Sequence, residues 1–205
     1  MSDPGPRIAL TFDAEHPDRP RCPPDAADRI LEALAGVSAR ATFFIQGRWA
    51  EAYPDRARRI ADEGHLVGNH SHFHARMTLL HDDGIAADVG DAAGHILAAC
   101  GVDPRPWFRC PFGDGHDDAR VLTSLERLGY RNVHWDLELE DWEPWTSGDG
   151  LAEAAVEGAL ACGDGAVVLL HTWPASTADA IPAILERLAA ADARFVAVDA
   201  LERLP

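Results

Sequence analysis

The chain of 205 residues is poor in positive charge and contains no lysine. Its 18 basic residues are all arginine and stand against 34 acidic ones, which gives a formal net charge of −16. Both halves of the chain are acidic, so neither offers the basic surface that nucleic acids or anionic membranes attract. The scarcity of positive charge therefore excludes a nucleic-acid partner and favours a neutral or cationic substrate.

Long apolar runs and closely paired cysteines are also missing. No stretch approaches the roughly 18 apolar residues of a membrane span, and the N-terminal residues show no basic segment followed by an apolar one of signal length. We therefore expect a cytoplasmic protein that does not bind membranes. The absence of a C-x-x-C pair excludes zinc-knuckle and thioredoxin-type motifs and predicts incidental or buried reduced thiols. The four cysteines are Cys22, Cys100, Cys110 and Cys162.

Hydrophobic residues make up 47% of the chain and charged residues 25%, which are values of an ordinary globular protein. Short β-like runs alternate with longer segments of helical period, and this predicts an α/β fold with parallel strands, as a barrel or a long open sheet. No repeat or low-complexity linker interrupts the alternation, so residues 1–205 are expected to form a single domain. The expected strands are Arg7–Phe12, Ala41–Ile45, Leu66–Asn69, Pro106–Arg109, Arg131–Asp136, Ala166–His171 and Arg194–Val198. The expected helices are Pro24–Ala35, Tyr53–Glu63, Asp82–Cys100, Asp117–Leu128, Asp149–Cys162 and Thr177–Ala191.

Reactive side chains follow the ends of these predicted strands. In a parallel β/α barrel, the carboxyl ends of the strands converge on one face, where such folds keep their chemistry. The polar residues are therefore expected to form one site. They are Asp13, Glu15, His70, His74, Arg109, Asp136, Asp141 and His171.

Two histidines in GNHSHFH, residues 68–74, are spaced as metal ligands. His70 and His74 lie four residues apart after a short apolar run and a Gly-Asn turn signal. Imidazoles at this spacing, on a helical turn or in a tight loop, can both reach one first-row cation. The alternative is chance, because the chain holds ten histidines. His72 has the wrong spacing and is expected to face solvent or to support the ligands from outside.

An open metal site generally needs a third protein ligand, commonly a carboxylate. TFDAEHP, residues 11–17, places Asp13, Glu15 and His16 at a strand end, where they can supply this ligand and a base. An acidic loop that caps the next segment is the simpler interpretation. Similarly, Arg109 in WFRCPFG can hold a carboxylate in its ionised state, or it can be a surface arginine at a turn.

Two later stretches carry further candidates. HWDLELEDW, residues 134–142, alternates like a strand and ends in an Asp-Trp pair, and its acids are most simply explained as a solvated loop. AVVLLHTWP, residues 166–174, is an almost wholly apolar strand that delivers His171. A histidine there can be a general acid, although histidines at the edge of a core are usually structural.

Taken in order, these five stretches resemble the motifs of the polysaccharide deacetylase family, also called carbohydrate esterase family four or the NodB homology domain. The resemblance runs from about Arg7 to Val198, nearly the whole chain. The first three motifs, T-F-D-D, H-S/T-x-x-H and R-x-P-Y-G, correspond to Thr11, Phe12 and Asp13, to His70, Ser71 and His74, and to Arg109, Pro111, Phe112 and Gly113. The last two, Asp-Trp and L-x-H, correspond to Asp141 and Trp142 and to Leu169 and His171.

The resemblance implies a distorted (β/α) barrel of seven or eight parallel strands that hydrolyses an N-acyl amide with the help of a metal ion. It implies that Asp13 is the general base that activates water and that His171 is the general acid that protonates the leaving amine. Arg109 would keep Asp13 ionised, and Asp141 would orient His171. The residues assigned to the substrate are Trp142, which walls the acyl pocket, Phe112, whose amide N–H helps to bind the oxyanion, Pro111 and Trp107.

The sequence departs from the family pattern at the metal. Where two adjacent aspartates are usual, the second position is Ala14, which cannot coordinate an ion. Glu15 is one residue further along and one methylene longer, and some relatives carry D-x-D or D-x-E at this place. The resemblance therefore implies one divalent ion held by Glu15, His70 and His74, with zinc first and cobalt or nickel as alternatives.

These implications predict a hydrolase that removes an N-acyl group, in the first place N-acetyl, from an amino sugar or an amino-sugar-containing small molecule. Its partner is then a small-molecule or oligosaccharide substrate. A hydrolase of cyclic imides, ureides or other small amides is one alternative, because tryptophans near the site suit a sugar ring and a planar heterocycle equally. The other alternative is a carbohydrate-binding pseudoenzyme that lost its metal with Ala14.

Overall fold

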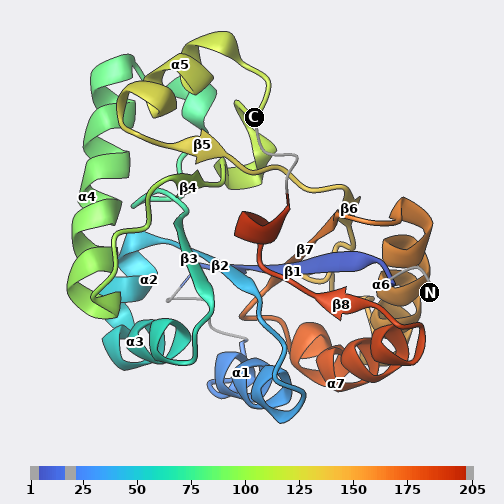
Figure 1. The fold of residues 1–205 in the computed structure, drawn as a ribbon. Helices are drawn as coiled ribbons and strands as arrows, with labels where there is room; N and C mark the ends of the chain where they lie inside the picture. The colour runs from blue at the N-terminus through green and yellow to red at the C-terminus, as the bar shows by residue number, and fades with distance from the viewer. Residues whose placement is uncertain (1–4, 17–21, 202–205) are drawn as a thin grey trace. The chain divides into compact units, whose positions relative to one another are not determined.

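The structure is a computed structural model of the protein, and it describes residues 5–16 and 22–201 (Figure 1). Contacts within the chain divide it into two compact units. Unit 1 comprises the described residues within 1–12, 19–42 and 135–203, and unit 2 comprises those within 13–18 and 43–134. The expectation of a single domain stays a prediction.

The described residues form eight strands, seven α-helices and three short 3-10 helices. The strands are β1 (Arg7–Ala14), β2 (Thr42–Ile45), β3 (Leu66–Asn69), β4 (Trp107–Phe108), β5 (Arg131–Asn132), β6 (Leu137–Glu138), β7 (Ala166–His171) and β8 (Arg194–Phe195). The α-helices are α1 (Ala26–Gly36), α2 (Gly47–Ala52), α3 (Pro54–Asp62), α4 (Asp82–Cys100), α5 (Ala119–Arg127), α6 (Gly148–Cys162) and α7 (Ala175–Ala190). The 3-10 helices are η1 (Met77–Leu79), η2 (Pro111–Gly113) and η3 (Val198–Ala200).

The long strands of unit 1 are buried and mostly apolar. β1 and β7 show no alternation of buried and exposed residues, as is typical of parallel strands that are covered on both faces. β1 pairs in parallel with β8, and β6 pairs in parallel with β7. Helices α6 and α7 lie side by side in this unit (Figure 1). His171, the last residue of β7, is therefore positioned by a buried strand.

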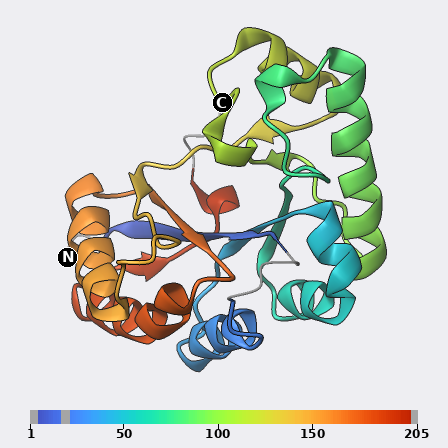
Figure 2. The same ribbon diagram turned by 180° about the vertical axis from the view of Figure 1, so that it is seen from behind.

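Unit 2 repeats the parallel pairing, with β3 against β4 and β4 against β5. Helix α4 packs against α2 and α3, as the view from behind shows (Figure 2). An apolar cluster stabilises the part of this unit between β4, α4 and α5. Its buried members are Met77, Ile85, Val89, Phe108, Cys110, Val121, Leu125 and Tyr130.

Backbone hydrogen bonds bring the strand ends of unit 2 level with one another. The Gln46 N–H donates to the Ala14 carbonyl at 2.9 Å, and the His70 N–H donates to the Ile45 carbonyl at 3.0 Å. The Arg109 N–H continues the series by donating to the carbonyl of Asn69 at 3.0 Å. Residues that directly follow these strands therefore gather at one edge, as the sequence predicts.

The predicted strand Arg131–Asp136 is wrong, because the chain changes its pairing partner within it. The Val133 N–H donates to the Phe108 carbonyl, whereas the Asp136 N–H donates to the Val167 carbonyl. The segment is therefore split into β5 and β6, and the chain between them is not a strand. The short helix α2 was not predicted either, since six residues are too few to show a helical period.

Among the described helices, none combines the length and the apolar composition that crossing a bilayer requires. The cytoplasmic location stays a prediction.

Candidate active site

Glu15, His70 and His74 come together in unit 2 and are called the first group below. Glu15 follows the last residue of β1, and His70 follows the last residue of β3. The His70 Nε2 lies 3.3 Å from the Glu15 Oε2, and the His74 Nε2 also contacts this oxygen. One ligand atom of each residue lies within 4.8 Å of the others. Two imidazole nitrogens and a carboxylate oxygen are a donor set found in zinc sites that keep one position open.

The backbone orients His70 toward the carboxylates. Its Nδ1 lies 2.9 Å from the carbonyl oxygen of Arg109, which can only accept a hydrogen bond, so Nδ1 carries the proton in the neutral ring. The unprotonated Nε2 then faces the Asp13 Oδ2 at 3.4 Å as well as Glu15. Complete burial lowers the pKa of His70, but the Asp13 and Glu15 carboxylates raise it by more, and the net shift is upward. The first group thus attracts positive charge, and a divalent cation fits its donor set.

Local backbone geometry holds His74 in place. It adopts the left-handed region with a φ of 58°, and its N–H donates to the Ser71 Oγ at 2.9 Å. Burial lowers the pKa of His74, which favours the neutral ring that can coordinate a metal. On the other side of the group, the His16 Nε2 lies 3.0 Å from the Glu15 Oε1. His16 therefore contacts the Glu15 carboxylate from outside the group and orients it.

Asp13 and Arg109 form a buried ion pair beside the first group. The Arg109 Nη1 lies 3.0 Å from the Asp13 Oδ1. The guanidinium also donates from Nε to the Val133 carbonyl at 3.1 Å and lies 4.2 Å above the centroid of the Phe44 ring. Arg109 thereby holds one carboxylate oxygen of Asp13, while the other faces His70.

Asn69 ties the segment of the two histidines to the core of unit 2. Its Nδ2 donates to the Val89 carbonyl at 3.0 Å and to the Tyr130 hydroxyl at 3.1 Å, and its Oδ1 accepts from the Ser71 N–H at 2.8 Å. The side chain is fully buried. The sequence shows Asn69 only as part of a turn signal, because two of its partners, Val89 and Tyr130, come from distant segments.

Replacing Asn69 with alanine is expected to lower the free energy of unfolding by about 2–5 kcal/mol, because three buried polar groups lose a partner. Tyr130→Phe is the matched control, since it removes only one of these bonds and should lower the free energy by about 1 kcal/mol. Urea unfolding followed by circular dichroism measures both. Equal losses in the two variants would contradict the central position of Asn69 in this network.

His171 and Asp141 form a hydrogen-bonded pair in unit 1. The His171 Nδ1 lies 2.7 Å from the Asp141 Oδ1, and the His171 backbone N–H donates to the Asp141 Oδ2 at 2.8 Å. The hydroxyl of Thr177 also donates to this Oδ2. An imidazole held at Nδ1 by a carboxylate has a fixed ring orientation and presents Nε2 for proton transfer. The contact with Thr177 was not predicted, because α7 brings it back to Asp141 from further along the chain.

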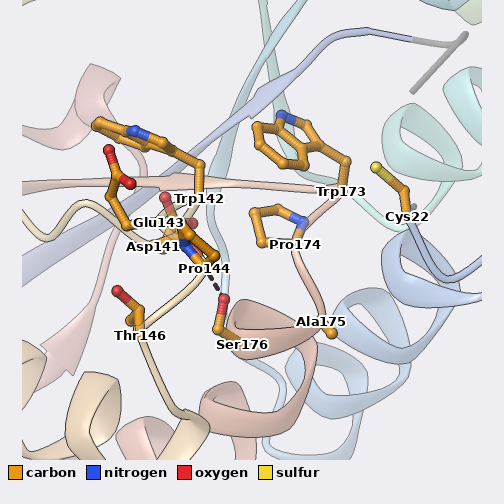
Figure 3. A pocket seen from close by; sticks show the side chains of 10 residues that line it. All are labelled: Cys22, Asp141, Trp142, Glu143, Pro144, Thr146, Trp173, Pro174, Ala175 and Ser176. Carbon is orange, nitrogen blue, oxygen red and sulfur yellow. Dashed lines mark hydrogen bonds between the residues drawn. The ribbon is translucent and has the colours of Figure 1, made fainter. Parts of the chain in front are cut away.

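A pocket of about 400 Å³ in unit 1 lies against Asp141 (Figure 3). The ring centroid of Trp142 lies 5.0 Å from that of His171, and the centroid of Trp173 lies 5.8 Å from it. Figure 3 shows both indole rings at the upper edge of the pocket and the hydrogen bond from Ser176 to the Asp141 carbonyl. This volume suits a small ligand or one sugar unit. The pocket is lined by Cys22, Asp141, Trp142, Glu143, Pro144, Thr146, Trp173, Pro174, Ala175 and Ser176.

The other residues assigned to the substrate fall in different places. The ring of Phe112 packs edge-on against His74 with a centroid distance of 4.4 Å, and Pro111 is buried next to it in η2. Trp107 is half-buried in β4, and its part in substrate binding stays a prediction. Of the two expectations for His72, exposure to solvent is wrong, because only 8% of the residue is exposed and its ring stacks on that of His95. The other expectation, that His72 supports the ligands from outside, stays a prediction.

The cysteines differ in burial as well. Burial raises the pKa of the Cys110 thiol to about 12 and that of Cys100 to about 11, whereas Cys162 is exposed. We expect iodoacetamide at pH 8 to modify Cys162 in the folded protein and to leave Cys100 and Cys110 unmodified until the protein is unfolded. Peptide mass spectrometry measures the three sites separately. Modification of Cys110 at the rate of Cys162 in the folded state would contradict its burial beside Arg109.

Unit 2 holds a histidine–carboxylate group beside a buried aspartate, and unit 1 holds a His–Asp pair; both are residue combinations that hydrolases use. The family model described as polysaccharide deacetylase matches residues 1–133. The chain belongs to this family, whose enzymes are hydrolases of N-acetyl amide bonds.

Relatives and solved structures agree with this assignment. The chitooligosaccharide deacetylase of Rhizobium leguminosarum bv. trifolii is 35% identical over 164 residues, which are 80% of this chain and 70% of the relative. A family 4 carbohydrate esterase from Streptomyces lividans, solved in complex with acetate, is 32% identical with a TM-score of 0.78 over 93% of this chain and 91% of its own. A CE4 family pseudoenzyme from Bacillus anthracis is 26% identical with a TM-score of 0.84 over 97% of this chain and 66% of its own. The predicted fold class, a distorted (β/α) barrel, is confirmed.

Proposed function

We propose that the protein is a metal-dependent deacetylase that hydrolyses the N-acetyl amide of an amino-sugar residue in a small molecule or oligosaccharide. The observation that carries this proposal is the first group itself. It combines two oriented imidazoles with a carboxylate and lies against the Asp13–Arg109 ion pair. Zinc is the first choice of ion, and cobalt or nickel also suits two imidazoles and a carboxylate.

When bound by Glu15, His70 and His74, a divalent ion supplies Lewis acidity toward the acyl carbonyl and toward water. Asp13 takes a proton from the attacking water as the water oxygen bonds to the acyl carbon. Arg109 compensates the charge of Asp13 and holds the carboxylate in position.

The second half of the reaction concerns the leaving amine. The amide nitrogen leaves readily only after protonation, and His171 donates this proton as the C–N bond breaks, which yields acetate and a free amine. Asp141 fixes the ring of His171 and balances its charge. The backbone N–H of Phe112 is proposed to donate to the oxyanion. Phe112 stands where the family motif has tyrosine, and this role does not need the tyrosine hydroxyl. Trp142 is proposed to wall the acyl group.

The relatives and the pocket in unit 1 support the proposed substrate class. Curated relatives include deacetylases named for chitooligosaccharides and for peptidoglycan N-acetylglucosamine. Trp142 and Trp173 offer aromatic faces on which a sugar ring can stack, and Glu143 places an acid in the same pocket. An acidic pocket in a protein of net charge −16 favours a neutral substrate and a cationic amine product.

Acetate release tests the proposal. The purified protein, reconstituted with zinc or cobalt, is incubated with N-acetylglucosamine oligomers of increasing length, and acetate is measured enzymatically. We expect release that depends on the metal and disappears in Asp13→Asn. A hydantoin and a dihydropyrimidine serve as imide and ureide probes, and activity on these alone would replace the deacetylase proposal. Bound metal without hydrolysis of any probe would instead support a carbohydrate-binding pseudoenzyme.

A further inference from the structure

A second cluster of metal-ligand side chains lies in unit 2 and shares no residue with the first group. Glu51 of α2, His72 of the loop after β3 and His95 of α4 each place one ligand atom within 4.8 Å of the others. These three residues are called the second group. Unlike an acidic surface cluster, it combines two imidazoles with one carboxylate, which is a donor set suited to zinc, nickel or copper.

The backbone around His72 is fixed by helix α4. Asp88 accepts from the His72 N–H with Oδ2 at 3.1 Å and from the Phe73 N–H with Oδ1 at 3.0 Å. His95 lies seven residues beyond Asp88 on the same helix, so both residues share one helical face. Helix α4 thus anchors the loop with one side chain and presents an imidazole to it with another.

Gly47 lets the elements of the second group approach closely. A Cβ atom on Gly47 would lie 2.4 Å from the His72 Nδ1 and 2.8 Å from the Cα of Ala92 in α4. Gly47 and Glu51 are four residues apart in α2 and therefore lie on the same side of this helix. The Nδ1 of His72 consequently faces the side of α2 that carries Glu51.

The ring of His72 holds a polar atom that the described residues leave unsatisfied. His72 is only 8% exposed, and its Nδ1 is buried without a hydrogen-bond partner in the described part of the chain. Buried polar atoms normally have a partner, so an orphaned ring nitrogen indicates a bound group. The rings of His72 and His95 stack with centroids 5.0 Å apart and planes inclined by 28°, so the two imidazoles are direct neighbours, and one nitrogen of each lies within 4.8 Å of the other.

We propose that Glu51, His72 and His95 bind a second divalent transition-metal ion. The three protein ligands leave a position for water, as in open zinc sites. Glu51 is exposed and His95 is half-buried, so the ion can enter from solvent without opening the core. His72 lies between His70 and His74, and an ion at the second group therefore restrains the segment that carries two residues of the first group.

Metal counting tests this proposal without reference to catalysis. The full-length protein is stripped with a chelator and equilibrated at fixed free zinc concentrations, and bound zinc is measured by elemental analysis. We expect His95→Gln to bind one ion fewer per chain than the wild type at the concentration that fills both groups. Glu51→Gln should weaken the binding of the same ion at least tenfold. His81→Gln is the matched control, because His81 is an exposed histidine beside the same helix and belongs to neither group.

His74→Gln distinguishes the first group from the second, because this variant should lose the ion of the first group and keep the ion of the second. The combination of His74→Gln and His95→Gln should then bind none. Cobalt gives an independent readout, because each occupied group adds to the intensity of the visible absorption. An equal number of bound zinc ions in the wild type, His95→Gln and Glu51→Gln overturns the second site, even if the first group fails to bind metal. Circular dichroism of the metal-free proteins checks folding, and Glu51→Gln decides the question if His95→Gln does not fold.

Discussion

Asp13→Asn is expected to reduce turnover about 10²–10⁴-fold, which is the loss typical of a missing general base, while bound metal stays near the wild-type value. The physical reason is the geometry of the carboxylate. Arg109 holds one oxygen of Asp13, and asparagine preserves the shape of the side chain but cannot accept the proton of water. Acetate release and elemental analysis on the same preparation measure the two quantities together.

Glu15→Gln is the contrasting variant, because Glu15 lies against both His70 and His74. A neutral amide oxygen is a poorer ligand than a carboxylate, so metal content should fall first and excess ion should restore part of the activity. Ala14→Asp, combined with Glu15→Gln, tests whether the usual aspartate of the family can replace this ligand. Loss of metal in Asp13→Asn together with full metal and full rate in Glu15→Gln would assign the ligand to Asp13 and leave the base unidentified.

His171→Gln is expected to abolish most amide hydrolysis, with a loss of about 10²–10⁴-fold, and to affect an activated ester much less. An amine leaves only after it receives a proton, whereas the phenolate of 4-nitrophenyl acetate leaves without one. The ratio of the two rates in wild type and variant is the measurement. It separates proton donation from a general loss of structure, which would reduce both rates equally.

Thr177→Val is the matched control for this pair. Thr177 donates to the Oδ2 of Asp141 and is not the proposed proton donor, so its removal should lower amide hydrolysis by far less than His171→Gln. The loss of amide hydrolysis in Asp141→Asn should lie between the losses in these two variants, because the ring of His171 keeps a neighbour at Nδ1 but loses the negative charge beside it. Equal losses of amide and ester hydrolysis in His171→Gln would remove His171 from the role of general acid.

The candidate site could be predicted from local sequence wherever its residues follow strands directly. Glu15 follows β1 and His70 follows β3, and parallel strands place such residues at one edge. Glu15 lies one position beyond Ala14 and has a longer side chain, and its replacement of the missing aspartate ligand stays a prediction. The prediction of one strand at Arg131–Asp136 was wrong, because the alternation of residues does not reveal a change of pairing partner, which depends on two other segments.

The sequence by itself determined the α/β class, because this class follows from periodicity. Its assignment of Glu15, His70 and His74 as metal ligands stays a prediction. Only the tertiary structure decided the partners that come from distant segments. Asn69 meets Tyr130, and Thr177 meets Asp141, at separations of 61 and 36 residues. His72 likewise turned out to be a buried neighbour of His95, not a surface residue. Such contacts depend on how helices pack against strand ends, and short sequence patterns carry no information about that packing.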